Sequence, residues 1–176
     1  GIHYIEINLS VIQCEKRDLA KRLISIVKKY DIAPGLINLE ITETASISAR
    51  TILLENMKTL INYGFTFSLD DFGKGESNLM YIVEMPVSIV KLDYDMLKAF
   101  FRSPKAKTVV QAVVNMAHNM NLKMVAEGIE TEEEIQGMSK ENIDYIQGYY
   151  YSCPVPQNDF LEFLRNNQPV LSSSAE

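Results

Sequence analysis

Two adjacent carboxylates, Asp70 and Asp71, end an apolar run that begins at Phe65, and Gly73 follows them closely. Two neighbouring acids repel each other, so a fold that places both at the end of a buried strand must offset that cost, and a bound cation commonly does so. Aspartate is also common at strand ends and at helix N-termini, where it caps backbone N–H groups. The pair alone therefore leaves both a metal site and a purely structural role open.

Further polar side chains follow the apolar runs along the chain. With the aspartate pair they form one set at the carboxyl ends of the expected strands: Asn8, Glu40, Asp70, Asp71, Lys91, Asp93, Glu127 and Gln147. The carboxyl ends of parallel strands converge on one face of a barrel, which is where barrel enzymes build their active sites. Six strands that end in such residues are hard to explain as six separate caps, so the sequence predicts a site at this face.

The chemistry of this set is that of hard oxygen donors. The donors are Asn8, Glu40, Asp70, Asp71 and Glu127. Such ligands favour Mg²⁺ or Mn²⁺ over zinc, and two adjacent aspartates can hold the two cations that assist a phosphoryl displacement. Lys91 among these acids can orient the attacking water, offset phosphate charge or serve only as a structural counter-ion. We predict four catalytic residues: Asp70, Asp71, Lys91 and Glu127.

Alternating strands and helices must position these residues. Alternation of branched residues predicts strands at 3–9, 36–41, 87–93, 123–126 and 144–147, with another in the run that begins at Phe65. Helical spacing predicts helices at 17–30, around 52–61, 77–83, 105–120 and 159–166, and a capping box at 131–134 opens one more. Strand followed by helix, six times over, implies an α/β fold with a parallel sheet covered by helices.

Composition limits the possible partners and compartment. A chain of 176 residues with 47% hydrophobic content can form one domain with a real core. A net charge of -6 argues against binding to a DNA or RNA duplex, which requires a basic face. Cys14 and Cys153 are far apart, so we expect neither a zinc site nor a disulfide, and a reducing cytoplasm fits. No apolar run approaches the roughly 20 residues that span a bilayer, so any membrane anchor would belong to other parts of a longer protein.

Six short motifs resemble, in order, those of the EAL domain, a family of bacterial phosphodiesterases that open cyclic di-GMP to the linear dinucleotide. The motifs are Asn8-Leu9-Ser10, Leu39-Glu40-Ile41-Thr42-Glu43, Asp70-Asp71-Phe72-Gly73, Lys91-Leu92-Asp93, Ala126-Glu127-Gly128-Ile129-Glu130-Thr131 and Gln147-Gly148-Tyr149. The likeness extends from Ile5 to Pro156. It implies a TIM-type (β/α) barrel of which this chain would supply about six of the eight βα units.

The resemblance also implies a role for each matched residue. The metal ligands would be Asn8, Glu40, Asp70, Asp71 and Glu127, with Asp70 shared by two Mg²⁺ or Mn²⁺ ions. Lys91 would lie beside the nucleophilic water, and Gln147 would complete the site by hydrogen bonding. Glu43 and Glu130 would brace the loop after Asp71 without touching the metals.

Three positions and one motif depart from the family pattern. The Glu-Ala-Leu strand has no counterpart, so we expect residues 1–171 to form a partial domain that starts at the family's third strand, and 172–176 to be a disordered tail. Lys74, Glu76 and Cys153 differ from the residues common in the family, and the sequence assigns them no role. Open sheet edges invite pairing, so we expect self-association or a swapped dimer.

Three functions compete at this stage. The first is metal-dependent hydrolysis of cyclic di-GMP by a parent domain, controlled by an attached sensor or diguanylate cyclase domain, with this chain alone being inactive. The second is a degenerate EAL domain that senses cyclic di-GMP or docks a partner without hydrolysis, and retention of the ligands argues against it. The third is an enolase-like enzyme with a lysine base, which would have to match six motifs by accident.

Overall fold

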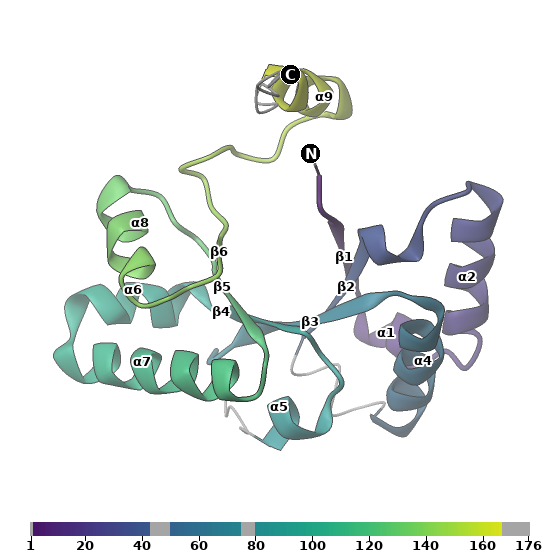
Figure 1. The fold of residues 1–176 in the computed structure, drawn as a ribbon, viewed down its shortest axis with the longest axis horizontal. Helices are drawn as coiled ribbons and strands as arrows, with labels where there is room; N and C mark the ends of the chain where they lie inside the picture. Colours follow the sequence, from purple (N-terminus) through teal and green to yellow (C-terminus); the bar gives the residue numbers. More distant parts are fainter. Residues whose placement is uncertain (1, 43–49, 75–79, 167–176) are drawn as a thin grey trace, which may run out of the picture.

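The computed structural model describes residues 2–42, 50–74 and 80–166. Within them, six parallel strands form one sheet in the order β1-β2-β3-β4-β5-β6, so each strand pairs with its neighbour in the sequence. The strands are β1 (Ile5–Leu9), β2 (Ile37–Thr42), β3 (Thr66–Phe72), β4 (Ile89–Leu92), β5 (Lys123–Ala126) and β6 (Tyr145–Ile146). The sheet curves into a half-barrel with β1 and β6 at its edges (Figure 1).

Helices connect the strands and lie mainly outside this curve (Figure 1). They are α1 (Val11–Cys14), α2 (Leu19–Lys29), the 3-10 turn η1 (Pro34–Leu36), α4 (Arg50–Tyr63), α5 (Met80–Glu84), α6 (Tyr94–Arg102), α7 (Pro104–Asn119), α8 (Glu132–Ser139) and α9 (Gln157–Asn166). Among the described helices, none combines the length and apolar content that crossing a bilayer requires. The alternation of strands and helices confirms the predicted α/β class.

The hydrophobic core lies between the outer face of the sheet and the helices. Leu39, Leu69 and Val90, on β2, β3 and β4, are fully buried there, as are Leu53 and Leu60 of α4. Each such side chain contributes about 1.5–3 kcal/mol on burial. Because successive side chains of a strand point to opposite faces, this apolar packing leaves the alternate residues on the inner face of the half-barrel.

Local capping explains several helix boundaries. The predicted capping box of α8 is present: the Thr131 side chain accepts the backbone N–H of Glu134, and the Glu134 side chain accepts the backbone N–H of Thr131. Two helices were not expected from the sequence. One is α6, whose N-cap Asp93 accepts the N–H of Asp95 at 2.9 Å; the other is the single turn α1, capped by Ser10. The chain therefore enters a helix after a single residue beyond the end of β1 and of β4.

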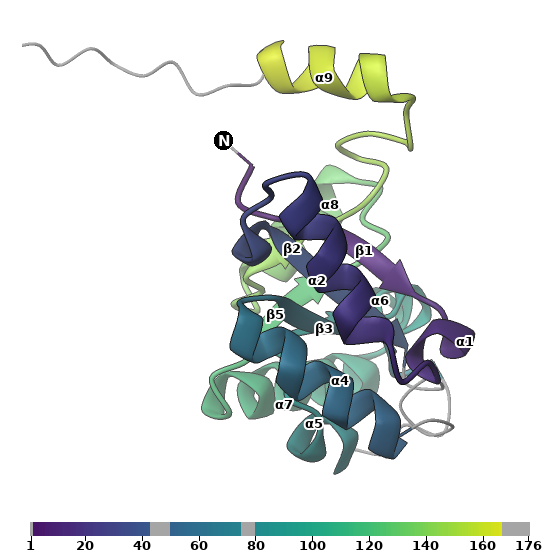
Figure 2. The ribbon, with the colours of Figure 1, turned by 90° about the vertical axis from the view of Figure 1, so that its right-hand side faces the viewer.

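The C-terminal helix α9 lies apart from the half-barrel in both views (Figure 1, Figure 2). None of its side chains is buried, and Phe160 and Phe163 are each 41% exposed. On the edge strand β1, Ile5 and Ile7 are 49% and 44% exposed. The predicted tail at 172–176 and the first three residues of the helix expected at 77–83 lie outside the described residues.

Candidate active site

Lys91 lies at the centre of a group of carboxylates on the inner face of the half-barrel. Its side chain is 2% exposed, and its ammonium donates a hydrogen bond to Glu40 and lies 2.6 Å from Oε1 of Glu127. Oδ1 of Asp70 is 3.9 Å from the same nitrogen. A fourth carboxylate, Glu6, places its Oε2 3.6 Å away. Four acids thus surround one cation.

Strand geometry brings these groups together. Glu40, Asp70 and Lys91 lie near the carboxyl ends of β2, β3 and β4, and Glu127 directly follows β5. Asn8, on β1, is the register partner of Glu40, although its side chain is exposed. The site-facing residues of four neighbouring strands therefore meet as the sequence predicted.

Burial sets the protonation behaviour of the group. It raises the pKa of Glu6 from 4.5 to about 7, against the attraction of Lys91. Burial also raises the pKa of Asp70 and Glu127, and Lys91 offsets only part of that rise. For Lys91 itself, burial lowers the pKa, but hydrogen bonds to Glu127 and Glu40 outweigh this effect and leave the pKa raised. One ammonium thus neutralises only part of the negative charge that four carboxylates can carry.

Asp71 has a different environment from Asp70. Its φ of 56° lies in the left-handed region that non-glycine residues seldom adopt, and the β3–β4 register shifts between Leu69 and Phe72. Its Oδ1 accepts a hydrogen bond from Nζ of Lys74 at 3.0 Å, whereas its N–H donates to Oδ1 of Asp70 at 2.8 Å. The two adjacent aspartates therefore have separate cationic partners.

The donor chemistry of the group fits a divalent metal ion. Glu40, Asp70 and Glu127 offer carboxylate oxygens only, which suits Mg²⁺, Mn²⁺ or Ca²⁺. Among the described residues, no three acidic, histidine or cysteine side chains already converge closely enough to chelate an ion. The Lys91 ammonium takes the central place in this arrangement, so metal binding requires the carboxylates to exchange one cation for another.

The remaining predicted residues lie around this centre. Gln147 is exposed, and it lines a cavity of about 370 Å³ together with Glu127 and Tyr94. Asp93 is buried at the N-terminus of α6. Glu130 places its Oε2 3.5 Å from Nζ of Lys98 on α6. The loop-bracing role of Glu130 and the site roles of Gln147 and Asp93 stay predictions.

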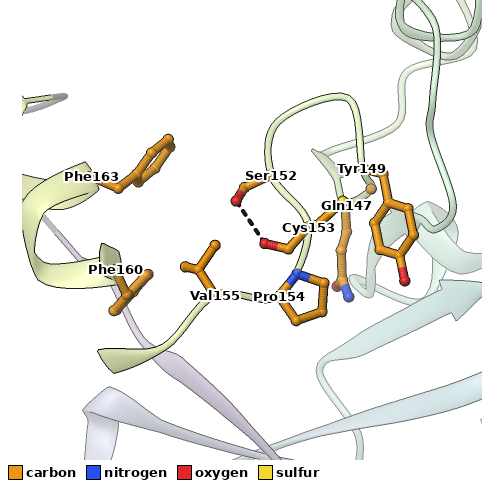
Figure 3. A pocket seen from close by; sticks show the side chains of 9 residues that line it. Gln147, Tyr149, Ser152, Cys153, Pro154, Val155, Phe160 and Phe163 are labelled. Atoms are coloured by element: carbon orange, nitrogen blue, oxygen red, sulfur yellow. Dashed lines mark hydrogen bonds between the residues drawn. The ribbon is translucent and has the colours of Figure 1, made fainter. Parts of the chain in front are cut away.

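The structure shows nothing of the loop-bracing role expected of Glu43, and the three positions without an assigned role, Lys74, Glu76 and Cys153, differ in what it shows of them. Glu43 and Glu76 lie outside the described residues. Lys74 is the exposed partner of Asp71. Cys153 is an exposed free thiol beside a separate cavity of about 350 Å³ between the C-terminal segment and α9 (Figure 3). Gln147 is the one predicted site residue that lines this cavity.

The sequence analysis missed Glu6 and a buried polar chain beneath the site. Asn38 donates to Oγ1 of Thr66 at 3.0 Å and accepts from Ser68 at 2.7 Å, which ties β2 to β3 on the inner face. Glu6 precedes Asn8 by two positions, so the two-residue period of a strand places both on one face. That period was the signal that could have found Glu6.

The family model of the EAL domain matches residues 1–154 of the chain. The chain belongs to the EAL domain family. The cyclic di-GMP phosphodiesterase RocR of Pseudomonas aeruginosa is 31% identical over 156 residues, which cover 89% of this chain and 40% of RocR. The signaling protein YkoW of Bacillus subtilis is 29% identical over 160 residues, 91% of this chain and 20% of YkoW. The chain thus spans less than half the length of these curated relatives.

Solved EAL structures share the fold. The EAL enzyme Bd1971, in a form bound to cAMP and cyclic di-GMP, superposes with a TM-score of 0.86 at 32% identity, over 92% of this chain and 43% of that one. Klebsiella pneumoniae BlrP1, in a manganese and cyclic di-GMP complex, gives a TM-score of 0.80 at 27% identity, over 88% of this chain and 40% of that one. The half-barrel is therefore part of the TIM-barrel-like EAL fold, a family whose structures include divalent-metal complexes.

Proposed function

We propose that this chain carries the catalytic face of a phosphodiesterase that hydrolyses cyclic di-GMP to the linear dinucleotide. The observation that supports the proposal most is the group of Glu40, Asp70 and Glu127 around Lys91 at the carboxyl ends of parallel strands. Curated EAL relatives are named cyclic di-GMP phosphodiesterases. Family membership favours this activity over the enolase-like alternative.

The proposed metal ligands are Asn8, Glu40, Asp70, Asp71 and Glu127, and the proposed ions are Mg²⁺ or Mn²⁺. Bound there, the two ions would activate a water molecule and stabilise the phosphodiester oxygens during in-line displacement. The chain's own contribution is to hold the carboxylates on adjacent strands and to keep the Lys91 ammonium among them. Lys91 then attracts the phosphate and orients the attacking water.

Hydrolysis can be tested directly with cyclic di-GMP and Mn²⁺, with the linear dinucleotide separated by liquid chromatography. The assay should use both this chain and a longer polypeptide that contains it. Asp70→Asn should abolish turnover with little effect on folding, whereas Glu15→Gln, an equal charge change at an exposed position, should retain the wild-type rate. Absence of product from the longer polypeptide would refute the catalytic proposal.

The alternative is a cyclic di-GMP sensor or interaction module that does not hydrolyse the nucleotide. Two observations support it. The Lys91 ammonium occupies the centre of the described site, and no three described acidic, histidine or cysteine side chains converge closely enough to chelate an ion. Calorimetry discriminates the two functions, because a sensor would bind cyclic di-GMP without forming product. Binding that requires Mn²⁺ and is followed by turnover would exclude it.

Assembly is a further part of the proposal. We infer that the chain self-associates through the exposed isoleucines of β1, Ile5 and Ile7, or through a swapped α9. In a longer protein, a sensor or diguanylate cyclase domain would control the site, and we expect the whole to act in the cytoplasm. Light scattering at micromolar concentration tests the assembly, and a stable monomer would contradict it.

A further inference from the structure

Glu6 is the member of the carboxylate group that no proposed role explains. Its Oε2 lies 3.6 Å from Nζ of Lys91, and its Oε1 is buried with no hydrogen-bond partner among the described residues. In the β1–β2 register it lies opposite Asn38, one layer deeper than the Asn8–Glu40 pair. Glu6 therefore approaches Lys91 from below the layer that holds the proposed metal ligands.

Lys91 and divalent cations compete for the same oxygen atoms. Within the described part of the chain, the ammonium makes its ion pairs with Glu40, Asp70, Glu127 and Glu6. The first three are proposed metal ligands, so cations bound there would take them from Lys91 and repel its charge. A buried ammonium left without a carboxylate is strongly unfavourable. A partner outside the ligand set is needed to keep it in the site.

We propose that Glu6 is a positioning residue that retains the Lys91 ammonium when divalent cations occupy Glu40, Asp70 and Glu127. This inference rests on the metal-dependent function proposed above. Because Glu6 lies one layer deeper in the half-barrel than the proposed metal ligands, its carboxylate holds the ammonium beneath the metal ions. From there the ammonium faces the layer of proposed ligands above it. When the Lys91 ammonium shifts the short distance from Glu40 and Glu127 to Glu6, divalent ions can take its place among the ligands. The buried ammonium then still has a carboxylate partner.

The test is a double-mutant cycle on Mn²⁺ affinity, measured by electron paramagnetic resonance with the wild-type chain, Glu6→Gln, Lys91→Met and the double variant. We expect Glu6→Gln to weaken Mn²⁺ binding about tenfold or more, since the ammonium then stays among the ligands. In the Lys91→Met background the same change should have no effect, because no ammonium remains to be displaced. Glu6→Asp keeps the charge and should restore most of the affinity, and Glu15→Gln is the charge-matched control.

The outcomes separate this inference from the proposed function. Equal Mn²⁺ affinity of wild type and Glu6→Gln would overturn the role of Glu6 while leaving the metal site intact. An equal loss in the Lys91→Met background would also overturn it, because Glu6 would then act on the ions directly or through the fold. Absence of Mn²⁺ binding by the wild-type chain would refute the metal proposal, and the role of Glu6 with it.

Discussion

Replacement of Glu6 by glutamine should stabilise the metal-free chain at pH 8 but not at pH 4. Burial is the main cause that raises the pKa of Glu6 from 4.5 to about 7, so the folded chain holds a proton that the unfolded chain releases across this range. The free energy of unfolding therefore falls as the pH rises from about 4.5 to 7. Each pKa unit corresponds to about 1.4 kcal/mol, and because the Glu6 side chain is 22% exposed and solvent screens part of its charge, we expect a loss of about 1–3 kcal/mol.

The amide introduced by Glu6→Gln cannot ionise, so the variant avoids this loss. Lys91 keeps its hydrogen bond to Glu40 and its contact with Glu127, which limits what the change removes. Urea denaturation with a chelator present, at pH 4 and pH 8, measures the difference for wild type and variant. Glu15→Gln serves as the control for charge alone. Equal pH dependence of wild type and Glu6→Gln would refute the reasoning, since it would mean that Glu6 ionises freely in the folded chain.

Three other changes probe the fold around the site. Lys91→Met should lower the free energy of unfolding by about 3–5 kcal/mol at pH 8, measured with urea, because it leaves buried carboxylates unpaired; a stabilised variant would contradict this. Asp144→Ala removes the acceptor 2.8 Å from the Met124 N–H and should cost about 1–3 kcal/mol in the same assay; an unchanged midpoint would show that water replaces it. Gly148→Ala would drive a Cβ into the backbone of Ile129, so calorimetry should show a loss of about 3 kcal/mol or more; an unchanged unfolding temperature would show that this backbone yields freely.

Much of the sheet could be predicted because its strands read as short apolar runs that end in polar residues. β2 alternates apolar Ile37, Leu39 and Ile41 with polar Asn38 and Glu40, so the strand period and the acid within it were both visible in the sequence. Glu40 and Lys91 were predicted to meet because parallel strands present their carboxyl ends to one face. Periodicity and topology together were sufficient for these positions.

Other features depend on contacts that local patterns do not encode. α1 has only four residues, which is too short to show a helical period. α6 does show one, with Leu97 and Phe100 buried on the same face, but its N-cap Asp93 was read as the end of a strand and the helix behind it was missed. Glu130 lies in the loop before α8, whereas its partner Lys98 lies on α6 far back along the chain, and no spacing rule links them. Glu6 lies inside β1 rather than at its end, so strand-end polarity does not reveal it, although its place in the two-residue period was plain.

The left-handed backbone conformation of Asp71 limits which residue types fit at that position, independently of their charge. Asparagine and aspartate tolerate this conformation better than other side chains, and β-branched residues are strongly disfavoured. Loss of activity in Asp71→Val or Asp71→Ala would therefore mix backbone distortion with loss of a carboxylate. Asp71→Asn alters the charge at nearly constant backbone cost, and it is the substitution that reports on the chemistry of this residue alone.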